Sequence, residues 1–332
     1  VLTYDNSAGT IGLEAASGGA STIGALDDVL MDATNFVDSL LIQTDSDGSA
    51  PTTGTLSSAE NNIGIGKDVF KAITNATMNV GIGGIALESL TSGDYHTAVG
   101  YGALSKITTV TNNTAVGFFA GRGIQNGGNN TAIGADVLRT DNDATQNTGV
   151  GASALKSTTG NANTGLGYRA LYANTSGTRN IAIGVQALDS ATTETDNIAI
   201  GHEAMYNPNG GDKNVAIGNY AMDAALTGDN NVAIGYAAGG AMTDAHSCVL
   251  IGHSAGVALT TGVRNVAIGF EALKTNTTSG DNVAIGEDSL TLLSTGSTAN
   301  VAIGRRSGYR ITANATDNVF IGGYETGGNI AS

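Results

Sequence analysis

Several residue types are scarce in this chain, and each shortage excludes a class of protein. Cys248 is the one cysteine among 332 residues, so no disulfide can form within the chain. No stretch of about 18 apolar residues exists, which excludes a transmembrane helix. Lysine and arginine number 14 against 29 aspartates and glutamates, a net charge of −15 that argues against nucleic acid or an anionic membrane as the partner.

Glycine and regularly placed hydrophobic residues are abundant instead. The chain holds 49 glycines and 41% hydrophobic residues, and the regular placement argues against disorder. Nearly the same nine letters recur as NVAIGNYAM (214–222), NVAIGYAAG (231–239) and NVAIGFEAL (265–273). Each copy can be indexed on one glycine, at 66, 83, 100, 117, 134, 151, 167, 184, 201, 218, 235, 252, 269, 286, 304 and 322. The steps are 17 residues, with one of 16 and two of 18, and such a fixed period predicts a repeat architecture over 61–326.

The residues before this glycine alternate in size. A β-branched residue stands three before it and Ile, Val or Leu one before it, while Ala or Gly lies between them in fourteen copies. The exceptions between them are Leu250 and Phe320. Alternation predicts a β-strand. We expect the large residues to face inward, and the small ones to form a smooth outer stripe that packs against another chain.

Asparagine stands four before the glycine in fourteen copies, with His96 and Cys248 as the exceptions. One amide per coil at one corner predicts a structural ladder that satisfies backbone groups of the turns. Its members are Asn62, Asn79, Asn113, Asn130, Asn147, Asn163, Asn180, Asn197, Asn214, Asn231, Asn265, Asn282, Asn300 and Asn318.

After the glycine most copies read Ala-Leu or Ala-Met at the third and fourth positions. Four copies have Gly at the fourth position, and in each a large residue follows three further on; the pairs are Gly121 with Ile124, Gly239 with Met242, Gly256 with Leu259 and Gly308 with Ile311. We expect the later residue to replace the missing core side chain. Each coil should then be a strand, a glycine corner, a short second strand and a polar return.

A period of 17 residues is too short for a βαβ unit, which predicts an all-β parallel β-solenoid of about sixteen coils. Three or four aliphatic side chains per coil make a thin core, so we expect a homo-oligomer. The alternative is a monomer whose alanine stripe faces solvent.

The N-V-A-I-G-x-x-A repeat resembles the head repeats of trimeric autotransporter adhesins, and more closely the arrays of bacteriophage tail fibres. NTAVGFFAG (113–121), NTAIGADVL (130–138) and NTGLGYRAL (163–171) carry the resemblance. It implies a left-handed β-roll that forms a homotrimer, located on the virion tail or outside the cell. It also implies a structural fibre shaft for host attachment, with other tail proteins and a host receptor or glycan as partners. A bacterial adhesin or extracellular filament is the alternative, and a polysaccharide depolymerase spike is a lower one.

Residues 1–60 break the period and are interpreted as a cap or junction, and residues 327–332 as a tail. Within the first segment, 25–43 has mixed periodicity that favours a short helix followed by a strand. An open β edge at the first coil would need covering.

Candidate chemical sites are few in the sequence. His202 and His253 share a column three coils apart, too far for one metal, and we expect no cofactor or metal site. Acidic pairs such as Asp27-Asp28 and Glu287-Asp288 have no unique pocket among near-identical coils, so we expect no enzyme. A column of five threonines from Thr97 to Thr164 would suggest ice binding if exposed, but it is expected to face the core. Aromatic residues after the glycine are the candidates for a partner-facing surface; they include Tyr101, Phe118, Tyr168, Tyr220, Tyr236 and Phe270.

Overall fold

The chain is an all-β parallel β-solenoid of about fifteen coils that recur every 17 residues or so. The computed structural model describes residues 2–5, 10–13, 29–33, 35–43, 53–140, 143–311 and 314–323, and none of these residues is helical. The solenoid prediction is confirmed. The coils fall into two compact units, Val1–Asn147 and Thr148–Ser332, which we call unit one and unit two.

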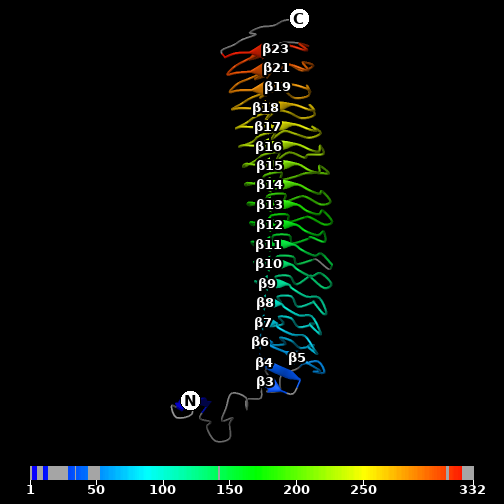
Figure 1. Cartoon of the computed structure of the whole chain (residues 1–332), viewed down its shortest axis with the longest axis vertical. Helices are drawn as coiled ribbons and strands as arrows, with labels where there is room; N and C mark the ends of the chain where they lie inside the picture. Colours follow the sequence, from blue (N-terminus) through cyan, green and yellow to red (C-terminus); the bar gives the residue numbers. More distant parts are fainter. Residues whose placement is uncertain are drawn as a thin grey trace. The chain divides into compact units, whose positions relative to one another are not determined.

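Unit one contains a two-stranded sheet, a hairpin and five stacked coils (Figure 1). Its strands are β1 (Leu2–Asp5), β2 (Thr10–Leu13), β3 (Val29–Ala33), β4 (Phe36–Ile42), β5 (Ala59–Glu60), β6 (Ile63–Ile65), β7 (Val80–Ile82), β8 (Thr97–Val99), β9 (Thr114–Val116) and β10 (Thr131–Ile133). Strands β6 to β10 pair in parallel and in register, so that equivalent positions of successive coils lie side by side.

Unit two repeats the same coil. Its strands are β11 (Thr148–Val150), β12 (Thr164–Leu166), β13 (Ile181–Ile183), β14 (Ile198–Ile200), β15 (Val215–Ile217), β16 (Val232–Ile234), β17 (Val249–Ile251), β18 (Val266–Ile268), β19 (Val283–Ile285), β20 (Leu292–Leu293), β21 (Val301–Ile303), β22 (Arg310–Ile311) and β23 (Val319–Ile321). The main strands form one parallel ladder, and β20 pairs with β22 on a second side.

The strands face the opposite way from our expectation. The small central residue points into the core and is fully buried, as in Ala216 and Ala233, while the flanking Val215 and Ile217 are only half-buried. The prediction of inward large residues and an outward alanine stripe was therefore wrong. Because each coil is tightly wound, its interior has room for a methyl group at the strand, and the bulky residues are left on the outer face.

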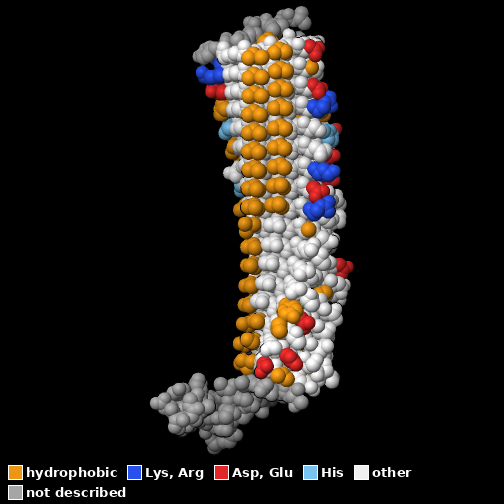
Figure 2. Space-filling view, in the orientation of Figure 1, with side chains coloured by type: hydrophobic (Ala, Val, Ile, Leu, Met, Phe, Trp, Pro, Cys, Tyr) orange, Lys and Arg blue, Asp and Glu red, His pale blue; other side chains and the backbone are white. Residues whose placement is uncertain are grey.

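The outer face of the strands thus carries rows of branched side chains, which we call the aliphatic stripe. In unit two it consists of the first and third residues of β13 to β19, β21 and β23, from Ile181 to Ile321, and Figure 2 shows them as two adjoining columns. In unit one the first column changes to Thr97, Thr114 and Thr131, all half-buried on the outer face. The expectation that this threonine column faces the core was also wrong.

The corner glycine is required by its conformation and by its neighbour. Gly218 has φ 134°, and a Cβ added there would lie 2.4 Å from the carbonyl oxygen of Gly235 in the next coil. Side chains are excluded from both this backbone region and this space. The corners therefore stack backbone against backbone.

The segment after the corner is a series of turns, and the predicted second strand is absent from most described coils. The residues two and four after the glycine have positive φ in every coil from Gly66 to Gly304, as at Tyr220 (60°) and Met222 (50°). Left-handed residues at alternate positions cannot continue an extended strand. The fourth residue is nevertheless usually a leucine or methionine, because its side chain is buried in the core.

In the four coils with glycine at the fourth position after the corner, the core is filled as we expected from the sequence. Ile124, Met242, Leu259 and Ile311 are fully buried, and a Cβ added at Gly239 would meet the Sδ of Met242. The structure adds a second source of volume. Leu250 lies against Gly239 and Gly256, and Phe320 lies against Gly308. The two large residues at the small strand position thus also fill space left by glycine.

The start of the solenoid is covered by a hairpin. Strand β4 pairs in parallel with β6, matching Leu40 to Ile63, and β3 pairs antiparallel with β4. Residues 29–33 are a strand, so the short helix expected within 25–43 is not found there. Pairing to the exposed edge of the first coil decides this local conformation. The tail at 327–332 lies outside the described residues.

Candidate functional site

The asparagine column forms the predicted ladder of buried amides. The backbone N–H of Asn231 donates to Oδ1 of Asn214 at 2.9 Å, and Nδ2 of Asn214 donates to the carbonyl of Gly228 at 2.9 Å. The amide of Asn214 therefore bonds to two backbone groups of the next coil, which lie 17 and 14 residues later. All fourteen ladder asparagines lie in this column. All of them except Asn318, at the end of the column, are buried.

His96 replaces an asparagine in the ladder with the same geometry. Its Nδ1 accepts from the N–H of Asn113 at 3.2 Å, 17 residues later, and its Nε2 lies 2.7 Å from the carbonyl of Val110, 14 residues later. These partners require a neutral ring with the proton on Nε2. Burial lowers the pKa of His96, an effect that outweighs the opposing contacts with Val110, Asn113 and Asp94.

Cys248 takes the same place in unit two. Its Sγ donates to the carbonyl of Gly262 at 3.3 Å and accepts from the N–H of Asn265 at 3.4 Å. Burial raises the pKa of this thiol, which keeps it in the protonated form that the ladder needs. The two exceptions in the asparagine column are therefore substitutes that keep one donor and one acceptor.

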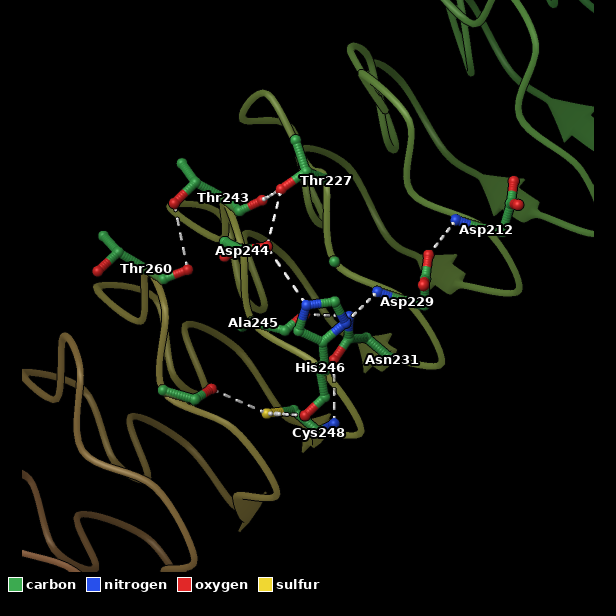
Figure 3. Close-up of polar contacts among 12 residues, drawn as sticks. Asp212, Thr227, Asp229, Asn231, Thr243, Asp244, Ala245, His246, Cys248 and Thr260 are labelled. Atoms are coloured by element: carbon green, nitrogen blue, oxygen red, sulfur yellow. Dashed lines mark hydrogen bonds and ion pairs between the residues drawn. The ribbon is translucent and has the colours of Figure 1, made fainter.

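A second set of polar contacts joins the turns near Cys248 (Figure 3). The N–H of Asp212 donates to Asp229, and the N–H of Asp229 donates to Nδ1 of His246 at 2.9 Å. The Nε2 of His246 lies 3.3 Å from Asp244, which also accepts from the hydroxyl of Thr227. These side chains link one coil to the next.

The same residues resemble a cysteine–histidine–aspartate arrangement, but the bonds are wrong for a nucleophile. Both ring nitrogens of His246 are engaged with Asp229 and Asp244, while the thiol of Cys248 contacts the carbonyls of His246 and Gly262. Activation of a cysteine needs a base at the sulfur and a lowered pKa. Among the described residues there is also no group of three or more His, Cys, Asp or Glu side chains that could hold a metal.

The acidic pairs give no catalytic geometry in the described part of the chain. Glu287 forms an ion pair with Arg305 at 3.3 Å. Asp27-Asp28 lies outside the described residues. A buried carboxylate that the sequence did not single out, Glu194, accepts backbone N–H bonds from Thr193 and from Gly210. It stabilises a turn and had no motif that could have revealed it.

Aromatic side chains gather in two separate columns. In unit two the rings of His202, Tyr220, Tyr236, His253 and Phe270 follow one another at centroid distances of 5.1 to 5.7 Å. In unit one Tyr101 and Phe118 are near-parallel at 6.0 Å, and Phe119 packs against both. Tyr168 is exposed and has no ring partner among the described residues.

The comparisons with known proteins give no family. No family model matches the chain, and no curated protein or solved structure matches it. In the described residues, no helix is long and apolar enough to cross a membrane. The surfaces of the coil itself are therefore the features that bear on function. One of these is the aliphatic stripe, whose large residues we had expected to find in the core.

Proposed function

We propose that this chain is the shaft of a bacteriophage tail fibre, in which three copies pack along their aliphatic stripes and support host attachment on the virion. The role is structural. The resemblance of the repeat supports the fibre, and the stripe supports the self-association.

The exposed stripe is the observation that carries the proposal. On β18 and β21 the outer isoleucines Ile268 and Ile303 keep 36% and 39% of their surface exposed, and equivalent residues repeat in every coil of unit two. Soluble monomers rarely expose continuous apolar patches of more than a few hundred Å². A face of this kind can pack against a second copy, in which branched side chains would fill the spaces between its rows.

The native mass in solution tests this function. Light scattering should give about three times the 33.0 kDa of one chain. The variant Val249→Glu places a charge within the stripe and should lower the mass, because an unpaired charge would be buried between copies. Thr261→Glu, which adds the same charge at an exposed turn, is the matched control.

Two results would contradict the proposal. One is a single 33.0 kDa species for the wild-type chain. The other is an unchanged trimer mass in Val249→Glu with β-structure intact by circular dichroism. Val249 is half-buried on the outer face in one chain, so a glutamate there leaves the coil itself able to fold.

A further inference from the structure

We propose that unit one binds an acidic carbohydrate through an aromatic–arginine patch made of Tyr101, Phe118, Phe119, Arg122 and Arg139. The proposal deepens the host-attachment role and rests on it for its biological setting. The binding chemistry itself depends on the patch alone. The patch lies within unit one, on the turns that follow the corner glycines of three successive coils.

The aromatic rings present an exposed apolar surface. Tyr101 and Phe118 keep 51% and 52% of their surface exposed, although each is in contact with other rings. Phe119 is half-buried, with its centroid 4.2 Å from that of Phe118. Packing against the half-buried Phe119 restrains the orientation of the exposed rings, so they meet a ligand with little loss of conformational freedom.

Two guanidinium groups lie beside these rings. The Cζ of Arg122 is 4.5 Å from the centroid of Phe119, and that of Arg139 is 5.4 Å away. Arg139 also pairs with Asp136 at 2.9 Å, whereas no described carboxylate forms an ion pair with Arg122. Arginine binds carboxylates through two parallel hydrogen bonds. Arg122 therefore offers its donors to an outside anion.

The local charge agrees with this interpretation. The chain carries a net charge of −15, yet residues 95–135 contain no aspartate or glutamate and include Lys106 and Arg122, and the next acidic residue, Asp136, is paired with Arg139. The second aromatic column is different. Glu203 and Glu271 directly follow His202 and Phe270 there, and no lysine or arginine of the described residues lies over a ring of that column. Of the two aromatic columns, only the one in unit one combines exposed rings with arginine side chains.

The small number of cations and the position of the patch on turns favour a carbohydrate over other anionic partners. Nucleic acid needs many phosphate contacts along its backbone, which two or three cations in an acidic chain do not supply. An acidic peptide would add as a strand to a sheet edge or enter a groove, but the patch lies on turns. Sugar rings can stack on exposed aromatic faces while a carboxylate reaches the arginine.

A glycan array probed with the full chain tests the patch. The array carries uronate- and sialate-bearing glycans together with their carboxyl-reduced or desialylated counterparts. We expect binding to acidic glycans and at least about tenfold weaker binding to the neutral counterparts, since a hydrogen bond to a charged group is lost. The variants Arg122→Gln and Phe118→Ala should each weaken binding about tenfold or more.

Phe270→Ala, in the acidic aromatic column, is the matched control and should bind as the wild type does. The proposal is overturned if no acidic glycan is retained, if Arg122→Gln and Phe118→Ala bind normally, or if single-stranded DNA or an acidic peptide on the same array is retained in place of the glycans. Light scattering on each variant separates the two proposals. A monomeric chain that still retains acidic glycans would contradict the trimeric shaft and leave the patch standing.

Discussion

The imidazole of His96 holds the backbone of Asn113 in the next coil as an asparagine would, with Nδ1 accepting from the N–H at 3.2 Å. This bond exists only in the neutral ring, because protonation would place a second N–H against the N–H of Asn113. A ladder that is otherwise made of amides and the protonated thiol of Cys248 thus has one member that can take up a proton in mild acid.

The chain should lose stability in mild acid because of His96. Its folded pKa is lowered mainly by burial, so the unfolded chain takes up the proton first. The contribution is full above about pH 6.5, and it is lost as the pH falls from there through the folded pKa. Thermal unfolding between pH 8 and pH 5 should show this slope, and His96→Asn should reduce it. His253→Asn, which changes an exposed ring, should keep the wild-type slope.

Asn214→Asp should destabilise unit two at neutral pH. The substitution keeps the acceptor for Asn231 but places a carboxylate oxygen against the carbonyl of Gly228, which Nδ2 now contacts at 2.9 Å. The expected cost is about 1–3 kcal/mol, measured by chemical unfolding. Lowering the pH should recover part of it, since the protonated acid can donate. Asn209→Asp, in an exposed turn, is the control, and an equal loss there would refute the role of the ladder.

Gly218→Ala should prevent the coil from closing, whereas Gly210→Ala should be tolerated better. Both glycines have positive φ, 134° and 106°. A Cβ at residue 218 would lie 2.4 Å from a carbonyl oxygen of the next coil, while a Cβ at residue 210 has nothing within 4 Å. The backbone conformation alone costs about 1–3 kcal/mol. Any larger difference in melting temperature between the two variants measures the stacking of corners.

Leu250 and Gly256 should show strong coupling in a double-mutant cycle. Leu250→Ala leaves a cavity over the glycine and should cost about 2–5 kcal/mol. Gly256→Leu brings a side chain into space that the Cδ atoms of Leu250 now fill, 2.9 and 3.0 Å from the added Cβ. The double variant restores the alanine and leucine of an ordinary coil. It should recover much of the lost stability but not all of it, because Leu250 also lies against Gly239, and additive losses would show that the two residues do not share this space.

The period and the amide column made the fold predictable, because both are properties of backbone stacking that repeat without change. Which face of the strand is buried could not be predicted. Alternation of Val215, Ala216 and Ile217 is the same whichever face is buried, and the outcome depends on how much room the coil encloses. The prediction of a second strand was wrong for most coils, because the identity of a leucine such as Leu188 does not indicate that its φ is 50°. The candidate aromatics were visible in the sequence, and Arg122 follows Phe119 by three residues in the same turn, but Arg139 lies in the next coil and meets that ring only through the stacking.

The stacking of identical corners bears on how such a gene can change. The bonds between neighbouring coils of the regular repeat join residues at fixed offsets of 17 and 14. Removing residues 215–231 would join Asn214 to Val232 and leave each column with the same kinds of neighbour above and below. Unequal recombination between the near-identical NVAIG segments would do this in one event. The number of coils is thus a heritable quantity that can change by whole coils while the packing within each coil is conserved.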